Sequence, residues 1–276
     1  MIIDTHLHVW TDDIETYPFA EGRTVAEPAP VELLNETMAA AGVDKAVIVQ
    51  PVHYLYDNRY VAECLRRFPG KFAAIGLVDR HAPDAPDQLE RLVQQGFGGL
   101  RIHLARPDDP AEWAVPDQDP IWQRAEALGA CFQPYGPAAL LPAIEPIVAR
   151  FPGVKVVLDH IGGAPCDEEP PYPLLSHVLK LATYPNVYLK FTPQPHKSGE
   201  PFPHRDTFPT FQRLYDAFGP QRLMWGTNFP GVLKGTGYKP SLELFQQYMD
   251  FLTEEDKTWL FSKTALQVWD FGGADD

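Results

Sequence analysis

The chain has 276 residues, of which 45% are hydrophobic and 22% are charged. This composition is ordinary for a globular protein and excludes a disordered, collagen-like or coiled-coil chain. The chain has 23 Lys and Arg residues against 37 Asp and Glu residues, which gives a net charge of −14. The electrostatic field of this negative charge repels phosphate backbones and anionic membrane surfaces. No local cluster of Lys and Arg residues in the sequence offsets it. We therefore expect neither a nucleic-acid partner nor a membrane partner.

Cysteine use and the first residues indicate the compartment. The three cysteines are odd in number and lack CxxC spacing, which argues against a disulfide framework and against a cysteine-based zinc site. The first ten residues carry Asp4 and two histidines where a signal peptide would need an apolar run, and no stretch approaches 18 apolar residues. We expect a soluble, cytoplasmic protein.

Short apolar, β-branched runs recur along the chain, and each is followed by a segment with helical spacing. This alternation is typical of βα units around a parallel sheet. The predicted strands are 2–8, 45–50, 72–78, 98–104, 130–134, 155–158, 187–191 and 223–226. The predicted helices are 31–41, 60–68, 88–95, 120–128, 140–151, 173–184, 210–218 and 242–252, with one more running from Thr253 toward Leu266.

Local signals refine the helix ends. Asp119 before Pro120 is typical of an N-cap followed by the first helical residue, and Gly42 and Gly129 stand where helices should stop. Eight βα units in a chain of this length predict one (β/α)8 barrel domain spanning residues 1–276. A doubly wound open sheet is the rival fold, but no GxGxxG or Walker sequence follows any strand.

Polar residues gather at the carboxyl ends of the predicted strands, where the active sites of such barrels lie. Because a barrel interior is normally filled with apolar side chains, these polar groups predict a site at one mouth. Four proline-rich loops, 16–30, 105–116, 164–173 and 192–209, follow strands on the same side.

His6 and His8 lie two apart on the first strand, so both imidazoles can face one ion or one substrate. The competing interpretation is a pair of hydrogen-bonded strand histidines, and the position at the strand end favours function. Asp159 could orient the neighbouring imidazole of His160, or His160 could point into the mouth, which we favour. Arg101 would be a costly buried cation unless it pairs with an internal acid or awaits an anionic substrate.

Four further residues are candidate substrate contacts because they follow strands two, four, five and seven. They are His53, His103, Tyr135 and Lys190, although each could also be a satisfied group on the rim.

Four motifs in this order resemble the amidohydrolase superfamily, in particular its second amidohydrolase family. They are Asp4-Thr5-His6-Leu7-His8, Gly98-Gly99-Leu100-Arg101-Ile102, Leu158-Asp159-His160-Ile161-Gly162 and Trp225-Gly226-Thr227-Asn228-Phe229-Pro230. The likeness spans nearly the whole chain and is greatest to the lactonase branch, which includes fuconolactonases and 2-pyrone-4,6-dicarboxylate lactonase. Decarboxylases are more distant members.

The resemblance implies that His6, His8 and His160 surround a reacting carbonyl or one divalent, zinc-like metal ion, and that Arg101 holds a substrate carboxylate. Metal-binding members use a Lys or His on strand five, but residues 131–135 offer neither. They also have an Asp after strand eight, where this chain has Asn228.

In the hydrolytic relatives that Asp accepts a proton from the attacking water, and an amide lacks comparable basicity. Three explanations remain open for Asn228: another group takes the proton, the reaction class has changed, or the chain is a disabled form that still binds substrate. Asn228 can still coordinate weakly or hydrogen-bond the water, so it stays a candidate site residue.

The sequence therefore predicts an enzyme that hydrolyses a small lactone or ester bearing a carboxylate or hydroxyls, with the carbonyl polarised by the histidines. The cofactor is either none or one zinc-like ion, and the partners we consider are a small-molecule substrate and further copies of the chain in a homo-oligomer. The alternatives are a decarboxylase or hydratase on the same scaffold, and a binding protein without catalysis.

Overall fold

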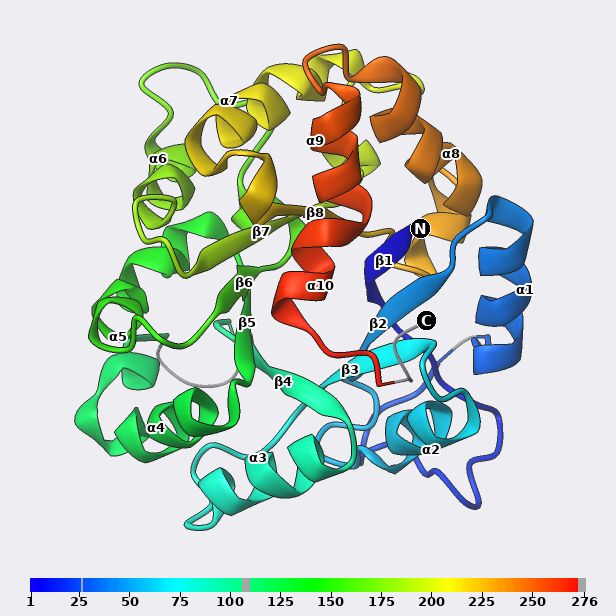
Figure 1. The fold of residues 1–276 in the computed structure, drawn as a ribbon, viewed down its shortest axis with the longest axis vertical. Helices are drawn as coiled ribbons and strands as arrows, with labels where there is room; N and C mark the ends of the chain where they lie inside the picture. Colours follow the sequence, from blue (N-terminus) through cyan, green and yellow to red (C-terminus); the bar gives the residue numbers. More distant parts are fainter. Residues whose placement is uncertain (26, 106–109, 273–276) are drawn as a thin grey trace.

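The computed structural model describes residues 1–25, 27–105 and 110–272. Eight parallel strands pair in sequence order, from β1 to β8, which confirms the predicted (β/α)8 barrel (Figure 1). The predicted strand ends differ from the observed ones by at most two residues. The strands are β1 (Ile3–Leu7), β2 (Lys45–Val49), β3 (Phe72–Gly76), β4 (Phe97–His103), β5 (Cys131–Tyr135), β6 (Val156–Leu158), β7 (Val187–Phe191) and β8 (Leu223–Trp225).

Helices surround the barrel, one group after each strand (Figure 1). They are α1 (Val31–Ala41), α2 (Arg59–Arg67), α3 (Ala85–Gln94), α4 (Asp119–Leu128), α5 (Glu145–Arg150), α6 (Pro173–Leu181), α7 (Phe208–Phe218), α8 (Tyr238–Glu243), α9 (Glu254–Thr258) and α10 (Thr264–Val268). Within the described residues, no helix combines the length and apolar character needed to cross a membrane.

Most of the predicted helix ends hold. Gly42 and Gly129 end α1 and α4 in the left-handed conformation, and Thr253 forms a capping box with Asp256 at the start of α9. The Asp119 prediction is wrong by one position, because a 3₁₀ turn leads directly into α4 and makes Asp119 its first residue.

Two predicted helices differ in form. The helix expected at 140–151 is divided into a 3₁₀ segment, Ala138–Ala143, and the short α5, because Pro142 lies within the first piece and a second proline begins the next. The helix expected at 242–252 starts earlier, as α8, and continues into a π-helical turn at Leu244–Tyr248.

β8 and β1 close the barrel through hydrogen bonds that replace a regular ladder. The His8 amide donates to the Phe229 carbonyl at 2.8 Å, and the Asn228 amide donates to the His6 carbonyl at 2.7 Å. The buried carboxylate of Asp4 accepts from both the amide and the hydroxyl of Thr227. Gly226 permits this approach, since a Cβ there would lie 2.8 Å from the Cβ of His6. The closure therefore sets the position of His6 and Asn228 directly.

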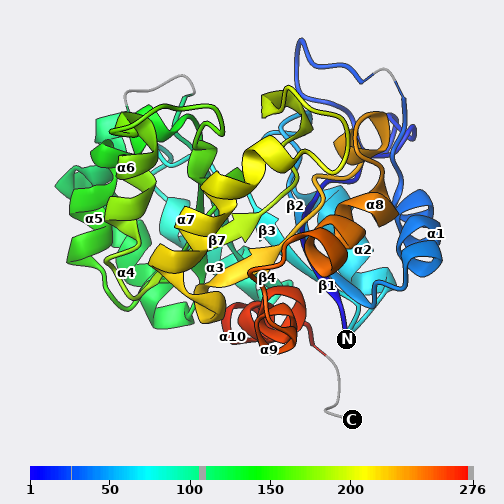
Figure 2. The same ribbon diagram turned by 90° about the horizontal axis from the view of Figure 1, so that it is seen from above.

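The C-terminal segment closes the end of the barrel at which the strands begin. Figure 1 shows α10 lying across the barrel, and Figure 2 places α9 and α10 at the end near the N-terminus. Trp269 follows α10 and packs with Ile3, Val47 and Met224 in the barrel interior. Its indole N–H donates to the Cys131 thiol at 3.3 Å. Because this end is filled with apolar groups, access to the barrel interior is left to the opposite mouth.

Candidate active site at the carboxyl ends of the strands

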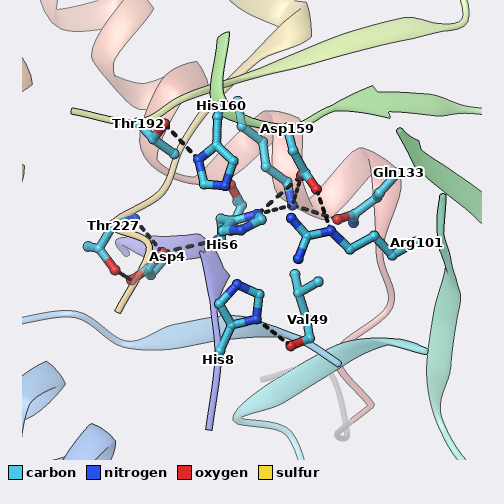
Figure 3. Close-up of polar contacts among 12 residues, drawn as sticks. Asp4, His6, His8, Val49, Arg101, Gln133, Asp159, His160, Thr192 and Thr227 are labelled. Atoms are coloured by element: carbon cyan, nitrogen blue, oxygen red, sulfur yellow. Dashed lines mark hydrogen bonds and ion pairs between the residues drawn. The ribbon is translucent and has the colours of Figure 1, made fainter. Parts of the chain in front are cut away.

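Three imidazoles meet at the open mouth. His6 comes from β1, His8 follows β1, and His160 follows β6. The ring of His6 lies 4.3 Å from that of His160 and 5.1 Å from that of His8, measured between centroids. Figure 3 shows His160 and His8 on opposite sides of His6. The prediction that these three residues come together is thus met by the geometry.

A buried ionic cluster lies beneath His6. Asp159 Oδ1 is 3.1 Å from His6 Nδ1 and 3.0 Å from Lys190 Nζ, and its other oxygen is 3.3 Å from Arg101 Nε. Lys190 also donates to Gln133 Oε1 at 2.7 Å. Burial acts to raise the pKa of Asp159, but the contacts with Lys190, His6 and Arg101 outweigh it and hold the pKa well below its usual range. Asp159 is therefore ionised and anchors the cluster.

The partner of His8 fixes its tautomer. His8 Nδ1 is 2.8 Å from the carbonyl oxygen of Val49, and a carbonyl oxygen can only accept. Nδ1 therefore carries the proton, and Nε2 presents a lone pair. Burial, followed by the charge of Arg101, lowers the pKa of His8 to about 3. The His8 imidazole is neutral near pH 7, with its basic nitrogen free of the Val49 contact.

In His160 the ring proton lies on Nε2, the opposite of the arrangement in His8. Its Nδ1 lies 3.1 Å from Thr192 Oγ1, which already accepts from the side chain of Gln194 at 2.8 Å. Thr192 is 1% exposed, and in the described part of the chain the acceptor within hydrogen-bond distance of its hydroxyl is His160 Nδ1. The hydroxyl therefore donates to Nδ1, which leaves Nε2–H on His160 as a donor. Burial and the nearby His6 keep the pKa of His160 well below its usual value.

A left-handed turn sets the direction of His160. His160, Ile161, Gly162 and Gly163 all have φ between 50° and 69°, an unusual run for residues with side chains. A Cβ on Gly163 would lie 2.2 Å from the carbonyl oxygen of Gly136 in the loop after β5. The two loops are therefore in backbone contact, and this packing holds the turn in place.

Arg101 brings a second cation to the site. Its guanidinium carbon lies 4.3 Å from the centre of the Tyr135 ring, and its side chain is buried. Arg101 and Lys190 carry two positive charges against the negative charge of Asp159, a sum of +1 for these three groups. The other buried acid nearby, Asp4, is bonded to Thr227 and Tyr238 at the barrel closure. Because the imidazoles are neutral, the guanidinium on the wall of the Arg101 cavity favours an anionic ligand there.

Two cavities open at the mouth. The first, called the His160 cavity here, has a volume of about 620 Å³ and is lined by Tyr135, His160, Gln194, Asn228 and Thr236, among others. The second, called the Arg101 cavity, has a volume of about 510 Å³ and is lined by Arg101, His103, Tyr56 and Trp113, among others. Ala105 lines both cavities, and the Tyr135 ring packs against both Arg101 and His160.

The remaining predicted contacts fall in three places. Tyr135 and His103 lie on the cavity walls, with ring centroids 5.7 Å apart. Lys190, expected to contact substrate, is 0% exposed and lies below the imidazoles among Gln133, Asp159 and His6. His53 lines a separate cavity with Trp10 and packs against its ring, because the turn after β2 leads away from the mouth.

Asn228 lies on the wall of the His160 cavity, in the left-handed conformation with φ of 64°. Asn tolerates this conformation better than most residues. The lining residues in the described chain include no Asp or Glu in this cavity. Asn228 thus presents a neutral amide to this cavity, and no described neighbour on the cavity wall supplies a carboxylate.

The imidazoles do not fit a metal ion as they are arranged. A metal ligand must offer a lone pair, and the hydrogen bonds of His160 leave a proton on the nitrogen that faces His6 and the cavity. Two cations, Lys190 and Arg101, lie beside the imidazoles. Across the described residues, no three His, Cys, Asp or Glu side chains are grouped so that they could hold a metal ion.

Sequence reasoning missed the groups that orient the imidazoles. The carbonyl of Val49, the Thr192–Gln194 pair and the Asp4–Thr227 closure each act on a histidine from another strand. Of the two interpretations of the Asp159–His160 pair, orientation of His160 by Asp159 is not what the structure shows, because Asp159 contacts His6. The period-two alternation along β5 and β7 was the available signal, since it places Gln133 and Lys190 on the barrel interior.

The chain is thus a (β/α)8 barrel with a polar site at the carboxyl ends of its strands, the position at which enzymes of this fold have their active sites. The family described as Amidohydrolase matches residues 3–271, and the chain belongs to this family.

Three characterised relatives match most of the chain. L-fucono-1,5-lactonase of Burkholderia ambifaria is 27% identical, over 83% of this chain and 80% of the relative. 4-Sulfomuconolactone hydrolase of Hydrogenophaga intermedia is 25% identical, over 82% and 74% respectively. D-galactarolactone isomerase of Agrobacterium fabrum is 25% identical, over 92% and 85%.

Solved structures share the fold. A Pseudomonas putida protein proposed to be a 2-pyrone-4,6-dicarboxylic acid hydrolase superposes with a TM-score of 0.84 at 22% identity, covering 98% of this chain and 97% of that one. An amidohydrolase from Burkholderia multivorans with bound zinc gives a TM-score of 0.80 at 22% identity, covering 97% and 98%. A zinc ion is thus bound in one structural neighbour.

Proposed function

We propose that this chain hydrolyses a small lactone that carries an anionic group. The observation that carries the proposal is the pair of unlike nitrogens at one mouth: a lone pair on His8 Nε2 and an N–H on His160 Nε2. Ester hydrolysis needs a group that takes a proton from water and a group that donates to the carbonyl oxygen. Relatives named as lactone hydrolases support the same reaction class.

In the proposed reaction, His8 Nε2 accepts a proton from water as the water oxygen bonds to the carbonyl carbon. The Nε2–H of His160 stabilises the negative charge that forms on the carbonyl oxygen. The ring C–O bond then breaks, and protonated His8 gives its proton to the departing alkoxide oxygen. The products are a hydroxyl and a carboxylic acid, which ionises in solution, so water and lactone are fully accounted for.

The anionic group of the substrate has a second role in this proposal. With a pKa of about 3, His8 is a weak base in the free protein, and the charge of Arg101 is one cause. A substrate anion on Arg101 would offset that charge and raise the pKa of His8. Binding of the correct substrate thus makes His8 a better base. Lactones are reactive enough for polarisation by imidazole, without the stronger Lewis acid that amides require.

The test measures hydrolysis of a panel of sugar lactones and carboxylated lactones. Hydrolysis of each lactone is monitored by the acid released at constant pH. The wild-type chain should open at least one anionic lactone, and His8→Gln and His160→Gln should each lose that activity while remaining folded by circular dichroism. Equal turnover by the wild type and both variants would reject the assignment. Carbon dioxide release from any carboxylic acid in the same panel would favour the decarboxylase alternative.

One observation favours a second candidate, a lactone isomerase. Asn228 stands in place of a carboxylate base, and the isomerase of Agrobacterium fabrum is among the relatives. An isomerase moves the acyl group to a hydroxyl of the same substrate and consumes no water. Carbon-13 NMR separates the two reactions, because an isomerase converts one lactone into another before any open-chain acid accumulates.

A further inference from the structure

Lys190 is a buried cation that the proposed reaction does not use. Its side chain is 0% exposed, and it lies below the mouth between Gln133, Asp159 and His6. A primary ammonium group has three protons and cannot accept a hydrogen bond. In such a dry position each proton needs an acceptor, because an unmet donor retains the cost of its lost hydration.

The three acceptors around Lys190 match its three protons. Nζ is 2.7 Å from Gln133 Oε1, 3.0 Å from Asp159 Oδ1 and 3.2 Å from His6 Nδ1. The third bond forms only if His6 Nδ1 carries a lone pair. In the other tautomer Nδ1–H points to Asp159, and the third ammonium proton is left with the face of Trp269, whose centre is 5.6 Å away.

Asp159 keeps two cationic neighbours in either tautomer of His6. Lys190 donates to Oδ1 at 3.0 Å, and the guanidinium of Arg101 lies 3.3 Å from Oδ2 as an ion pair without a hydrogen bond. In the tautomer that satisfies Lys190, the negative charge of Asp159 therefore still faces two cations. In the tautomer that satisfies Asp159, one buried ammonium proton has no oxygen or nitrogen acceptor among the described residues.

We propose that Lys190 is a positioning residue: it donates to Nδ1 of His6 and so selects the neutral tautomer whose Nε2 carries the proton. That Nε2 is buried and has no partner in the described part of the protein. His6 itself lines neither cavity, but its ring lies 4.3 Å from that of His160, which lines the His160 cavity, so a ligand acceptor would have to enter beside His160 to reach this N–H. The identity of the acceptor rests on the proposed function: it is the lactone carbonyl oxygen. His6 and His160 each donate one imidazole N–H to this oxygen.

The chemical consequence follows from the unlike histidines. His6 and His160, with centroids 4.3 Å apart, both donate, whereas His8 alone offers a lone pair to the mouth. This set supplies the base that addition of water to a carbonyl needs, and it gives the carbonyl oxygen two donors in place of one. The same selection works against a metal ion, since a metal would need lone pairs on all three Nε2 atoms.

Nitrogen-15 NMR of the resting protein tests the tautomer without any substrate. Histidine is labelled selectively, the His6 signals are identified from their loss in His6→Gln, and long-range correlations distinguish protonated from unprotonated ring nitrogens. We expect Nε2 protonated and Nδ1 unprotonated for His6. In Lys190→Met, we expect the proton to move to Nδ1, because Asp159 then becomes the one neighbour that can bind it.

The control is Lys45→Met, a lysine whose Nζ donates to the Gly70 carbonyl, outside the contacts of His6. It should leave the His6 signals unchanged. A wild-type His6 with its proton on Nδ1 would overturn the proposal, and that result needs no variant to fold. An unchanged His6 tautomer in folded Lys190→Met would also overturn it.

The consequence for turnover is measured separately. Loss of one carbonyl donor should lower kcat of Lys190→Met about 100-fold, with KM changed far less. If the chain opens no lactone but His6 has the expected tautomer, the proposed function fails and the role of Lys190 stands. If lactones are opened but His6 carries its proton on Nδ1, the role of Lys190 fails alone.

Discussion

His8 Nδ1 lies 2.8 Å from the carbonyl oxygen of Val49, an atom that can only accept a hydrogen bond. This contact between β1 and β2 turns the basic nitrogen of His8 away from Val49 (Figure 3). The hydroxyl of Thr192 holds His160 in the other tautomer, with the proton on Nε2. The site thus has one imidazole that accepts a proton and one that donates, set by two unrelated neighbours.

Replacing the base should remove most of the turnover. His8→Gln keeps a polar side chain of similar length but has no nitrogen that accepts a proton near pH 7. We expect kcat on an active lactone to fall about 10²- to 10⁴-fold, the usual contribution of a general base. His177→Gln on α6 is the matched control and should retain full activity. Wild-type kcat in His8→Gln would exclude His8 as the base.

Arg101 should decide which lactones are bound. Arg101→Met removes the guanidinium that faces the Arg101 cavity, and we expect kcat/KM for a carboxylated lactone to fall about 100-fold, the scale of a lost charged hydrogen bond. Neutral lactones should lose much less. Arg101→Lys keeps the charge without the planar fork and should recover part of the loss. A uniform loss on charged and neutral substrates would argue against anion recognition.

The pH profile of kcat/KM should show no fall on the acidic side that comes from protonation of a histidine. Burial, the charge of Arg101 and the neighbouring His160 lower the pKa of His8 to about 3, with Asp159 and the Val49 carbonyl opposing them. A base with a lowered pKa stays neutral as the pH falls, so His8 should add no limb to kcat/KM between pH 8 and pH 5. Burial raises the pKa of Asp4 to about 6, so a limb in that range would belong to the carboxyl that joins β1 to β8. Because a bound anion offsets Arg101, the His8 limb of kcat should appear at higher pH than that of kcat/KM. A decline of kcat/KM with a midpoint near 6.5 that persists in Asp4→Asn would contradict this assignment.

Chelation should leave the activity unchanged. The tautomers of the mouth present one lone pair and at least one N–H, a poor set for a divalent metal. After dialysis against EDTA, we expect turnover within about two-fold of the untreated protein. Loss of activity that added zinc restores would show that the imidazoles rearrange to bind metal.

The left-handed turn after β6 should be sensitive to one methyl group. Gly163→Ala places a Cβ 2.2 Å from the Gly136 carbonyl, at φ of +69°. We expect a loss of about 2 kcal/mol or more in the free energy of unfolding, together with a lower kcat because His160 moves. Gly22→Ala is the control, since it has nearly the same φ of +70° and nothing within 4 Å. Equal effects of the two variants on melting temperature would show that the loop contact is unimportant.

The strands were the most predictable part of the fold. Buried parallel strands are continuous apolar runs, and runs such as Lys45–Val49 and Val187–Phe191 are bounded by turn residues. Helix ends were harder to predict. Asp119 lies inside α4 because the preceding residues already form a 3₁₀ turn, a preference that depends on tertiary packing.

The partners of the site residues were not predictable from spacing. Asp159 and His160 are neighbours in sequence, yet Asp159 contacts His6, because His160 enters a left-handed turn and faces away. His53 appeared to follow a strand toward the mouth, but it lies in the turn after β2 with its ring beside that of Trp10. Such outcomes depend on backbone dihedrals that residue types alone leave open.

The reaction is tested most directly by opening an anionic lactone in water enriched in oxygen-18 and analysing the product by mass spectrometry. Attack of water that has lost its proton to His8 predicts one heavy oxygen in the new carboxylate, and His8→Gln should form this labelled product about 10²- to 10⁴-fold more slowly. A panel of anionic lactones that the wild-type chain leaves unlabelled, or merely rearranges into other lactones, would contradict hydrolysis.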